Sequence, residues 1–307
     1  MGMSTPLRLV AYVLGLAVVF AGSLGVGRAV GPRGGPAAHD TAVEHGDGDH
    51  AGPAGAAGAA GAAGAAEPPA GLQVAQDGYR LQPLTAALTP GAAAEFAFRV
   101  LGPDGTPLTR YTPTHEKDLH LIVVRRDLSG FQHVHPRLGA DGTWRTPLLV
   151  PAAGQYRVFA DFRPADRAGA LTLGADLPAA GTYVPAPLPP ASRTATVDGY
   201  TVELSGDLVA GTASKVTLRV SRDGRPVTDL QPYLGAYGHL VTLRAGDLAY
   251  LHTHPDGAPG DGRTRAGPEI VFHVEVPSAG AYRLYLDFQH DGVVRTAEFT
   301  VAHSGHG

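Results

Sequence analysis

The strongest constraint on this chain is an internal repeat. Residues 120–136 and 239–255 each open with His-Leu, close with His-x-His-Pro and separate the first two histidines by the same interval (133 − 120 = 13 and 252 − 239 = 13). Residues 150–162 and 276–288 repeat a second phrase, Val-Pro-x-Ala-Gly-x-Tyr-Arg-x-x-x-Asp-Phe. Because phrases that recur in a fixed order mark copies of one structural unit, we predict two copies of a single domain.

The residue content indicates that both units are built from strands. The chain holds 42 Gly and 26 Pro, and short β-rich segments alternate with turn signals such as Asp104-Gly105 and Asp141-Gly142. Short strands at this spacing are typical of antiparallel sandwiches, and the sequence contains no convincing amphipathic helix. We therefore predict an all-β fold of two tandem Ig-like antiparallel β-sandwiches, each with its own apolar core. The expected core residues are Phe96, Phe98, Val100, Ile122 and Val124 in the first sandwich and Val216, Leu218, Val220, Val241 and Leu243 in the second.

The predicted boundaries follow changes in composition. The first sandwich is expected over residues 72–180, a Pro-rich linker over 181–192, the second sandwich over 193–302 and a short tail over 303–307. Residues 31–71 are a low-complexity Gly-Ala-Ala segment with almost no bulky apolar side chain. Such a segment cannot offset the entropy of ordering, so we predict a disordered linker.

The N-terminal residues predict a location outside the cytoplasm. Residues 9–27 form an apolar run between Arg8 and Arg28. About 19 residues suffice to span a bilayer core and exceed the usual apolar region of a signal peptide. We predict that residues 1–30 hold a signal anchor with an N-terminal transmembrane helix, with a cleaved signal peptide as the alternative. The bulk of a single-pass cell-membrane protein, or the whole of a secreted one, would then be extracytoplasmic.

Charge and motif content narrow the classes of function. The net charge of −4 gives no electrostatic support for a nucleic-acid partner. The chain has no Cys, which excludes thiolate ligands and a blue-copper site. No Ser-His-Asp order, phosphate loop or nucleotide fingerprint points to an enzyme, so none is predicted.

The histidines of the repeated motif are the candidate metal ligands. We expect each motif to form a hairpin, with the first loop at residues 127–130, so that Val124 faces His133 and Ile122 faces His135. Since side chains alternate along a strand, each hairpin then carries its three histidines on one face. The candidate ligands are His120, His133 and His135 in the first unit and His239, His252 and His254 in the second.

Two questions about these histidines stay open at this point. In the expected register His120 lies too far from His133 for a flat sheet to bring all three imidazoles to one ion. The alternative is a set of neutral histidines that are buried and hydrogen-bonded for structure. If metal binds, its affinity should fall below about pH 6.5, because only deprotonated imidazole is a ligand.

Two aspartates are weaker candidates. Asp161 and Asp287 each share a strand face with an arginine, Arg157 or Arg283, so an Arg–Asp pair along the strand is the favoured interpretation. The alternative is a carboxylate that binds the metal or holds a histidine. His115, Asp118 and His273 have no counterpart in the other copy and rank lower. Imidazoles without sulfur ligands suit Cu(II), the favoured ion, and Zn(II), the alternative.

Parts of the sequence resemble a known group of bacterial envelope proteins. The phrases at residues 115–124, 131–136 and 156–162, with 234–240 and 251–255 in the second unit, are similar to secreted or membrane-anchored heavy-metal-binding (YtkA-like) proteins. The resemblance implies an envelope location and copper handling, with a metal ion as cargo for storage, delivery or resistance. The alternative function is a metal-free envelope module that binds a protein partner and buries its histidines for structure.

Overall fold

The computed structural model of this chain describes residues 69–303 except residue 252. The apolar run at residues 9–27, most of the predicted linker and the tail at residues 304–307 lie outside the described residues. All regular elements within the described range are strands, which confirms the all-β prediction. Among these residues there is no helix that is long and apolar enough to cross a membrane.

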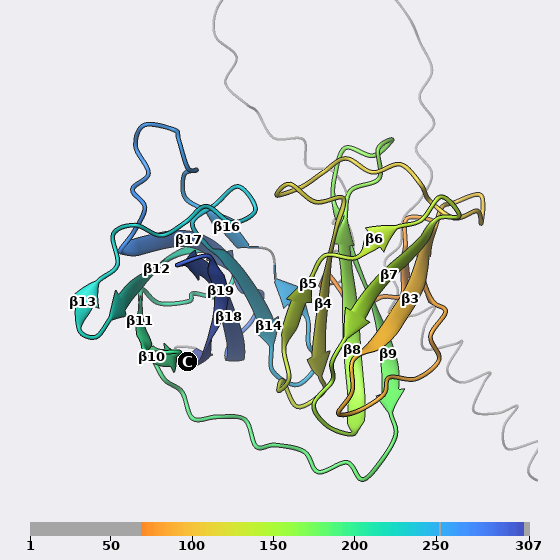
Figure 1. Ribbon diagram of the computed structural model, residues 1–307, viewed down its shortest axis with the longest axis horizontal. Coiled ribbons are helices and arrows are strands. Elements are labelled where there is room, and N and C mark those ends of the chain that lie inside the picture. Colours follow the sequence, from red (N-terminus) through yellow and green to blue (C-terminus); the bar gives the residue numbers. More distant parts are fainter. Residues whose placement is uncertain (1–68, 252, 304–307) are drawn as a thin grey trace, which may run out of the picture. The chain divides into compact units, whose positions relative to one another are not determined.

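Each repeat is a sandwich of two antiparallel sheets (Figure 1). The strands of the first repeat are β1 (Ala75–Gln76), β2 (Tyr79–Pro83), β3 (Ala94–Leu101), β4 (Leu119–Arg125), β5 (Gln132–Val134), β6 (Arg137–Leu138), β7 (Thr143–Leu148), β8 (Gly154–Phe162) and β9 (Leu171–Ala179). One sheet has the order β1-β2-β3-β7-β6 and the other the order β5-β4-β8-β9.

The second repeat has the same plan. Its strands are β10 (Thr194–Val197), β11 (Tyr200–Ser205), β12 (Ala213–Arg222), β13 (Arg225–Pro226), β14 (His239–Arg244), β15 (Tyr250–Leu251), β16 (Thr253–Pro255), β17 (Glu269–Glu275), β18 (Gly280–His290) and β19 (Val293–His303). The sheets have the orders β10-β11-β12-β17-β16, with β13 beside β12, and β15-β14-β18-β19.

This strand order is that of an immunoglobulin-type sandwich. Such folds often carry a tyrosine near the start of the sixth strand, whose hydroxyl bonds to a backbone carbonyl a few residues upstream. Both repeats have it: Tyr156 donates to the carbonyl of Ala152 at 2.8 Å, and Tyr282 donates to the carbonyl of Ser278 at 2.6 Å. The repeated phrase around Val-Pro-x-Ala-Gly-x-Tyr therefore encodes the same corner twice.

Each sandwich has its own core, and the two repeats also share a third one. Leu119, Leu121 and Val123 of β4 pack inside the first sandwich, whereas Ile122 and Val124 point out of its opposite face. A strand that is buried on both faces reads as a continuous apolar run. The buried residues of the third core, called the inter-repeat core below, are Ile122, Val124, Leu128, Phe159, Val241, Leu243, Leu248, Tyr250 and Tyr285.

The inter-repeat core corrects one expectation. Ile122, Val124, Val241 and Leu243 do not belong to separate sandwich cores, because they pack against one another across the two repeats. Two aromatic pairs cross this boundary. Phe131 stacks on Tyr285 with ring centres 3.9 Å apart, and Phe159 lies 5.7 Å from Tyr250. Phe131 and Tyr250 hold equivalent positions in the two repeats, and so do Phe159 and Tyr285. The contact between the repeats is therefore approximately symmetric.

The end of the predicted linker is also part of the folded unit. The N–H of Gly71 donates to Thr172 at 2.9 Å, and the N–H of Tyr250 donates to Ala70 at 2.9 Å. Gly71 has φ of +74°, and a Cβ there would meet the Phe159 ring at 2.5 Å, so only glycine fits. These residues are held by backbone hydrogen bonds from both repeats, which a prediction from composition alone does not detect.

Candidate metal centre

The first hairpin has a register different from the expected one. Ile122 lies opposite His133 and Leu121 opposite Val134, so continuing by one residue places His135 opposite His120. The expected register is wrong by two residues because the turn closes earlier: the N–H of Arg125 donates to the carbonyl of Ser129 at 2.9 Å. A shift of two residues keeps every side chain on its predicted face.

The corrected register brings three imidazoles together. His120 now lies opposite His135 and diagonal to His133, so all three reach one point. The His120 Nδ1 atom lies 3.0 Å from His133 Nε2 and 3.2 Å from His135 Nε2. One nitrogen from each ring lies within 4.8 Å of the other two. These three residues are called the histidine cluster below.

The cluster lies on the outer face of β4, beside the inter-repeat core. His120 is on the same face as Ile122 and Val124, and its side chain is almost completely buried. The cluster borders a cavity of about 40 Å³. Residues of both repeats line this histidine cavity, among them His115, His120, His133, Asp161 and His239. The histidines therefore face the second repeat and not the interior of their own sandwich.

Hydrogen bonds outside the cluster fix where two of its protons lie. The Nε2–H of His120 donates to the carbonyl of Thr114 at 2.9 Å, and the Nδ1–H of His133 donates to the Asp287 carboxylate at 2.8 Å. A carbonyl or carboxylate oxygen only accepts, so each ring keeps its proton on the outward nitrogen. In neutral imidazoles the two inward nitrogens, His120 Nδ1 and His133 Nε2, then face each other without a proton.

Burial keeps the imidazoles of His120, His135 and His239 neutral. Burial, followed by the neighbouring His133, lowers the pKa of His120 from 6.5 to about 3. Burial also lowers the pKa of His135 to about 3 and that of His239 to about 4. Protons therefore compete with a metal at these residues only in much more acidic solution than the unperturbed value of 6.5 implies.

Matching turns hold the first histidine of each motif. Thr114 and Lys117 close a turn before β4, and Tyr233 and Ala236 close one before β14. The carbonyl of Tyr233 accepts the Nε2–H of His239 at 2.9 Å, as Thr114 does for His120. The two repeats thus fix the same tautomer, which leaves Nδ1 as the nitrogen that can bind a metal.

Asp287 is the carboxylate that couples the repeats. It lies opposite His239 in the β14–β18 pair and is 3% exposed. One of its oxygens accepts from His133 of the other repeat, and the other accepts from Thr296 Oγ1 at 2.6 Å. From the sequence, this role is the alternative to an Arg–Asp pair.

The structure gives both arginines partners other than those of the favoured Arg–Asp pairs. Arg157 binds Asp176 and the carbonyl of Gly71, and Arg283 binds Glu298. Asp161 lies opposite His120 in the β4–β8 pair, lines the histidine cavity and accepts from Thr172 Oγ1 at 3.2 Å. Each aspartate therefore lies beside the first histidine of its own motif, while the arginines turn to acidic residues on the neighbouring strands.

Among its described residues, the second motif does not form a matching cluster. Its hairpin pairs Thr242 with Leu251, and then the chain crosses to the other sheet, where His254 lies opposite His273. His254 is exposed and does not join His239 in the histidine cavity. His252 lies outside the described residues. The prediction that His239 and His254 share a face of one hairpin is therefore wrong.

His115, which ranks low as a candidate ligand in the sequence, lines the histidine cavity. His115 lies in the turn before β4, with its ring 6.0 Å from the His120 ring and 5.1 Å from the His239 ring. It has no counterpart in the second repeat, which is why the repeat comparison gave it little weight. Its position five residues before His120, in the phrase His-Glu-Lys-Asp-Leu-His, was the available signal.

Comparison with known proteins identifies the family but not an activity. The family model described as "Domain of unknown function (DUF8832)" matches residues 73–179 and again residues 195–305. This chain belongs to the DUF8832 family. The two matches correspond to the two sandwiches, so the family unit is a single repeat. No curated protein matches the sequence.

Solved structures that resemble this chain are distant. The Escherichia coli adhesin FdeC is 14% identical over 74% of this chain and 64% of its own, with a TM-score of 0.24. The Yersinia pseudotuberculosis adhesin InvE is 11% identical over 73% of this chain and 58% of its own, with a TM-score of 0.23. The D0–D1 domain of intimin is 11% identical over 72% of this chain and 97% of its own, with a TM-score of 0.20. This chain thus spans less than two thirds of the first two.

Proposed function

We propose that this chain binds a divalent transition-metal ion at the histidine cluster, with Cu(II) as the favoured ion and Zn(II) as the alternative. The observation that carries the proposal is the contact between His120 Nδ1 and His133 Nε2 at 3.0 Å. Both nitrogens carry lone pairs when their rings are neutral, because both protons are committed elsewhere. Two lone pairs at this distance repel, and a cation between them removes the repulsion.

The spacing of the nitrogens fits ligands of one ion. Imidazole nitrogens bind Zn(II) at about 2.0–2.1 Å, so two ligands of a tetrahedral ion lie about 3.3 Å apart. The separations of 3.0 Å and 3.2 Å are close to that value. The histidine cavity, at about 40 Å³, has room for a further ligand of the size of water.

The hydrogen bonds around the histidine cluster support its assignment as a metal ligand set. Histidines that bind metals usually donate their other N–H to a carboxylate or a backbone carbonyl, which orients the ring. Asp287 and the carbonyl of Thr114 are such partners for His133 and His120. With nitrogen donors and no sulfur, the set suits Cu(II) and Zn(II) better than Cu(I).

The proposed biological setting rests on the N-terminal sequence. The apolar run at residues 9–27 supports a membrane tether with the sandwiches outside the cytoplasm. Together with the resemblance to heavy-metal-binding envelope proteins, this supports a role in metal storage, delivery or resistance. The resemblance is carried by the same phrases that contain His120, His133 and His135.

A second function has one observation in its favour. His133 and Asp287 join the two repeats next to a shared apolar core, so the contact could serve only to lock the sandwiches as one rigid envelope module. In that case His133 would be an imidazolium paired with the carboxylate, and its Nε2–H would donate to His120. A partner protein, and not a metal, would then bind elsewhere on the module.

The test is equilibrium dialysis of the full-length chain against Cu(II) and Zn(II), followed by elemental analysis. The double variant His133→Ala/His135→Ala should lose one bound equivalent relative to the wild type. His290→Gln is the matched control, because His290 bonds to Tyr200 and Asp229 outside the histidine cavity. Fluorescence of Trp144, which is buried in the first repeat, reports whether each variant is folded.

Two outcomes decide between the functions. Loss of one equivalent in the folded double variant, with nitrogen couplings in the Cu(II) electron paramagnetic resonance spectrum of the wild type, supports the metal site. Unchanged stoichiometry in the folded double variant rules out the histidine cluster as a metal site and leaves the rigid module as the better function.

A further inference from the structure

The two histidines of β16 and β17 form a pair of their own on the second repeat. His254 lies directly opposite His273 in the antiparallel β16–β17 pair. Residues in this relation have Cβ atoms about 4.5–5.5 Å apart and point to the same face of the sheet. The face is accessible to solvent: His254 is exposed, and the His273 side chain is 45% exposed. Two imidazoles in this arrangement can bind the same ion.

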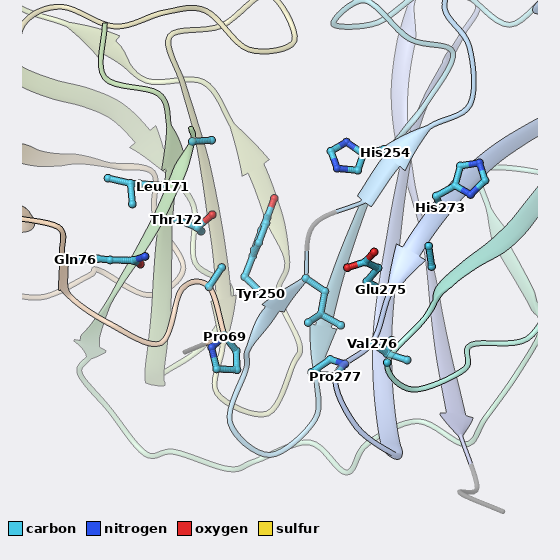
Figure 2. A pocket seen from close by; sticks show the side chains of 15 residues that line it. Pro69, Gln76, Leu171, Thr172, Tyr250, His254, His273, Glu275, Val276 and Pro277 are labelled. Carbon is cyan, nitrogen blue, oxygen red and sulfur yellow. The ribbon is translucent and has the colours of Figure 1, made fainter. Parts of the chain in front are cut away.

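Two carboxylates lie on the same face. Asp256 follows His254 by two residues, and one of its oxygens lies 3.9 Å from His273 Nε2. Glu275 follows His273 by two residues, and side chains alternate across a strand, so it shares the face as well. Figure 2 shows Glu275 on the same side as His254 and His273, and all three line a groove of about 640 Å³.

We propose that His254 and His273, with a carboxylate from Asp256 or Glu275, form a second and solvent-exposed site for a divalent transition-metal ion such as Cu(II) or Ni(II). Imidazole is a good ligand for Cu and Ni, and mixed nitrogen and oxygen donors suit Cu(II) and Ni(II). Lys215 lies opposite His273 on β12 and is the cation nearest in register, so it weakens the site. The two carboxylates oppose that effect.

The position of the pair gives it a role beside the buried cluster. Tyr250 lines both the groove and the histidine cavity. Thr172 of the groove donates to Asp161 of the cavity at 3.2 Å. The groove and the histidine cavity are therefore neighbours that share the Tyr250 side chain. The exposed site would capture the ion from solvent before it reaches the cavity. This role rests on the proposed function, whereas the exposed site itself does not.

The experiment is a calorimetric titration of the full-length chain with Cu(II), using His133→Ala/His135→Ala as the background. That background should retain one equivalent, and adding His254→Gln or His273→Gln should weaken its binding at least tenfold. The additional substitutions are at exposed positions, so the fold should survive, and an unchanged melting temperature checks this. His290→Gln in the same background is the control and should change nothing.

The outcomes keep the two sites distinct. If His273→Gln leaves the retained equivalent unchanged in affinity and stoichiometry, the exposed site is overturned. If instead the background variant binds as much metal as the wild type, the buried site fails, but the loss caused by His273→Gln still supports the exposed one. Asp256→Asn/Glu275→Gln should weaken the retained equivalent severalfold, and unchanged binding would remove the carboxylate from the ligand set.

Discussion

The two copies of the histidine motif have the same spacing but differ in where the chain crosses from one sheet to the other. In the first copy, the hairpin partner of β4 continues past His133 before the chain crosses to the other sheet at β6. In the second copy, the partner of β14 ends at Leu251, and the next strand already pairs in the other sheet. The crossing therefore comes earlier in the second motif, before the Thr253–Pro255 strand that ends it.

This difference separates the histidines of the second copy. The β14–β15 register, continued, would have placed His254 opposite His239, just as His135 lies opposite His120. Because the chain crosses first, His239 stays in the histidine cavity and His254 faces solvent beside His273. Equal spacing in sequence thus does not determine which sheet a strand joins, and so it does not keep the histidines of a motif on a common face.

The aromatic pairs of the inter-repeat core provide the largest effect to test. Tyr285 is fully buried, stacks on Phe131 and donates to the carbonyl of Leu128 at 2.7 Å. Replacing Tyr285 with Ala should lower the free energy of unfolding by about 3–5 kcal/mol, as for other buried aromatic residues. The counterpart on the other side of the core, Tyr250→Ala, should cost less, because that ring borders the groove and the cavity.

Urea unfolding followed by Trp144 fluorescence measures the first repeat in both variants. Equal losses in Tyr285→Ala and Tyr250→Ala would contradict the difference between the two sides of the core. A loss below about 1 kcal/mol in Tyr285→Ala would mean that the repeats do not depend on this contact, since buried aromatic truncations normally cost several times more.

Spacing and alternation predict the repeat, the sandwiches and the shared face of His120, His133 and His135. They do not predict the register of the β4–β5 hairpin. Asp127 fixes that turn by accepting from Ser129 and Arg125, and Leu128 has φ of +67°. These contacts depend on local geometry that a hydrophobic pattern does not contain.

The packing of one repeat on the other is reflected in the sequence of β4. Residues 119–124 are apolar at every position except His120, a pattern typical of a strand buried on both faces. Only one of those faces belongs to the sandwich core. The second face was the sign of a partner surface, but the sequence does not say that the partner is the other repeat. The link from His133 to Asp287, 154 residues later, depends on that arrangement.

Substitutions of Asp287 and Asp161 compare the two repeats at the histidine cluster. Asp287→Ala removes the acceptor for the His133 Nδ1–H, so the ring loses its fixed orientation. We expect metal affinity at the buried cluster to fall about 10–100-fold, the usual effect of removing such a partner. Asp161→Ala is the equivalent change in the first repeat, because Asp161 lies opposite His120 and lines the histidine cavity.

Competition of each variant with a chromophoric chelator gives the two affinities. Asp287→Asn is the matched control, because its amide oxygen can still accept from His133 and should restore part of the binding. If Asp161→Ala weakens binding as much as Asp287→Ala does, the two carboxylates act equivalently, and the asymmetry argued for the two motifs does not extend to them.

The smallest effect concerns pH and separates the buried histidines from the rest of the fold. Histidines in the unfolded chain bind a proton near pH 6.5. In the folded chain, burial lowers the pKa values of His120 and His135 to about 3 and that of His239 to about 4. Between these values the unfolded state binds more protons than the folded state. The stability is therefore complete above about pH 6.5 and is lost progressively as the pH falls below it.

The single variant His120→Gln measures how much one histidine contributes to the pH dependence of stability. Each such histidine changes the free energy of unfolding by at most about 1.4 kcal/mol per pH unit. The wild type should therefore lose more stability than His120→Gln between pH 6.5 and pH 4.5 in metal-free urea titrations. The carboxyl groups of Asp127 and Asp141, whose pKa values are lowered to about 2 by hydrogen bonds, begin to contribute only in more acidic solution. Ile122→Val, on the same strand face, is the control that should lower stability without changing its slope with pH. Parallel slopes for the wild type and His120→Gln would contradict the lowered pKa of His120, because the folded and unfolded chains would then bind this proton equally.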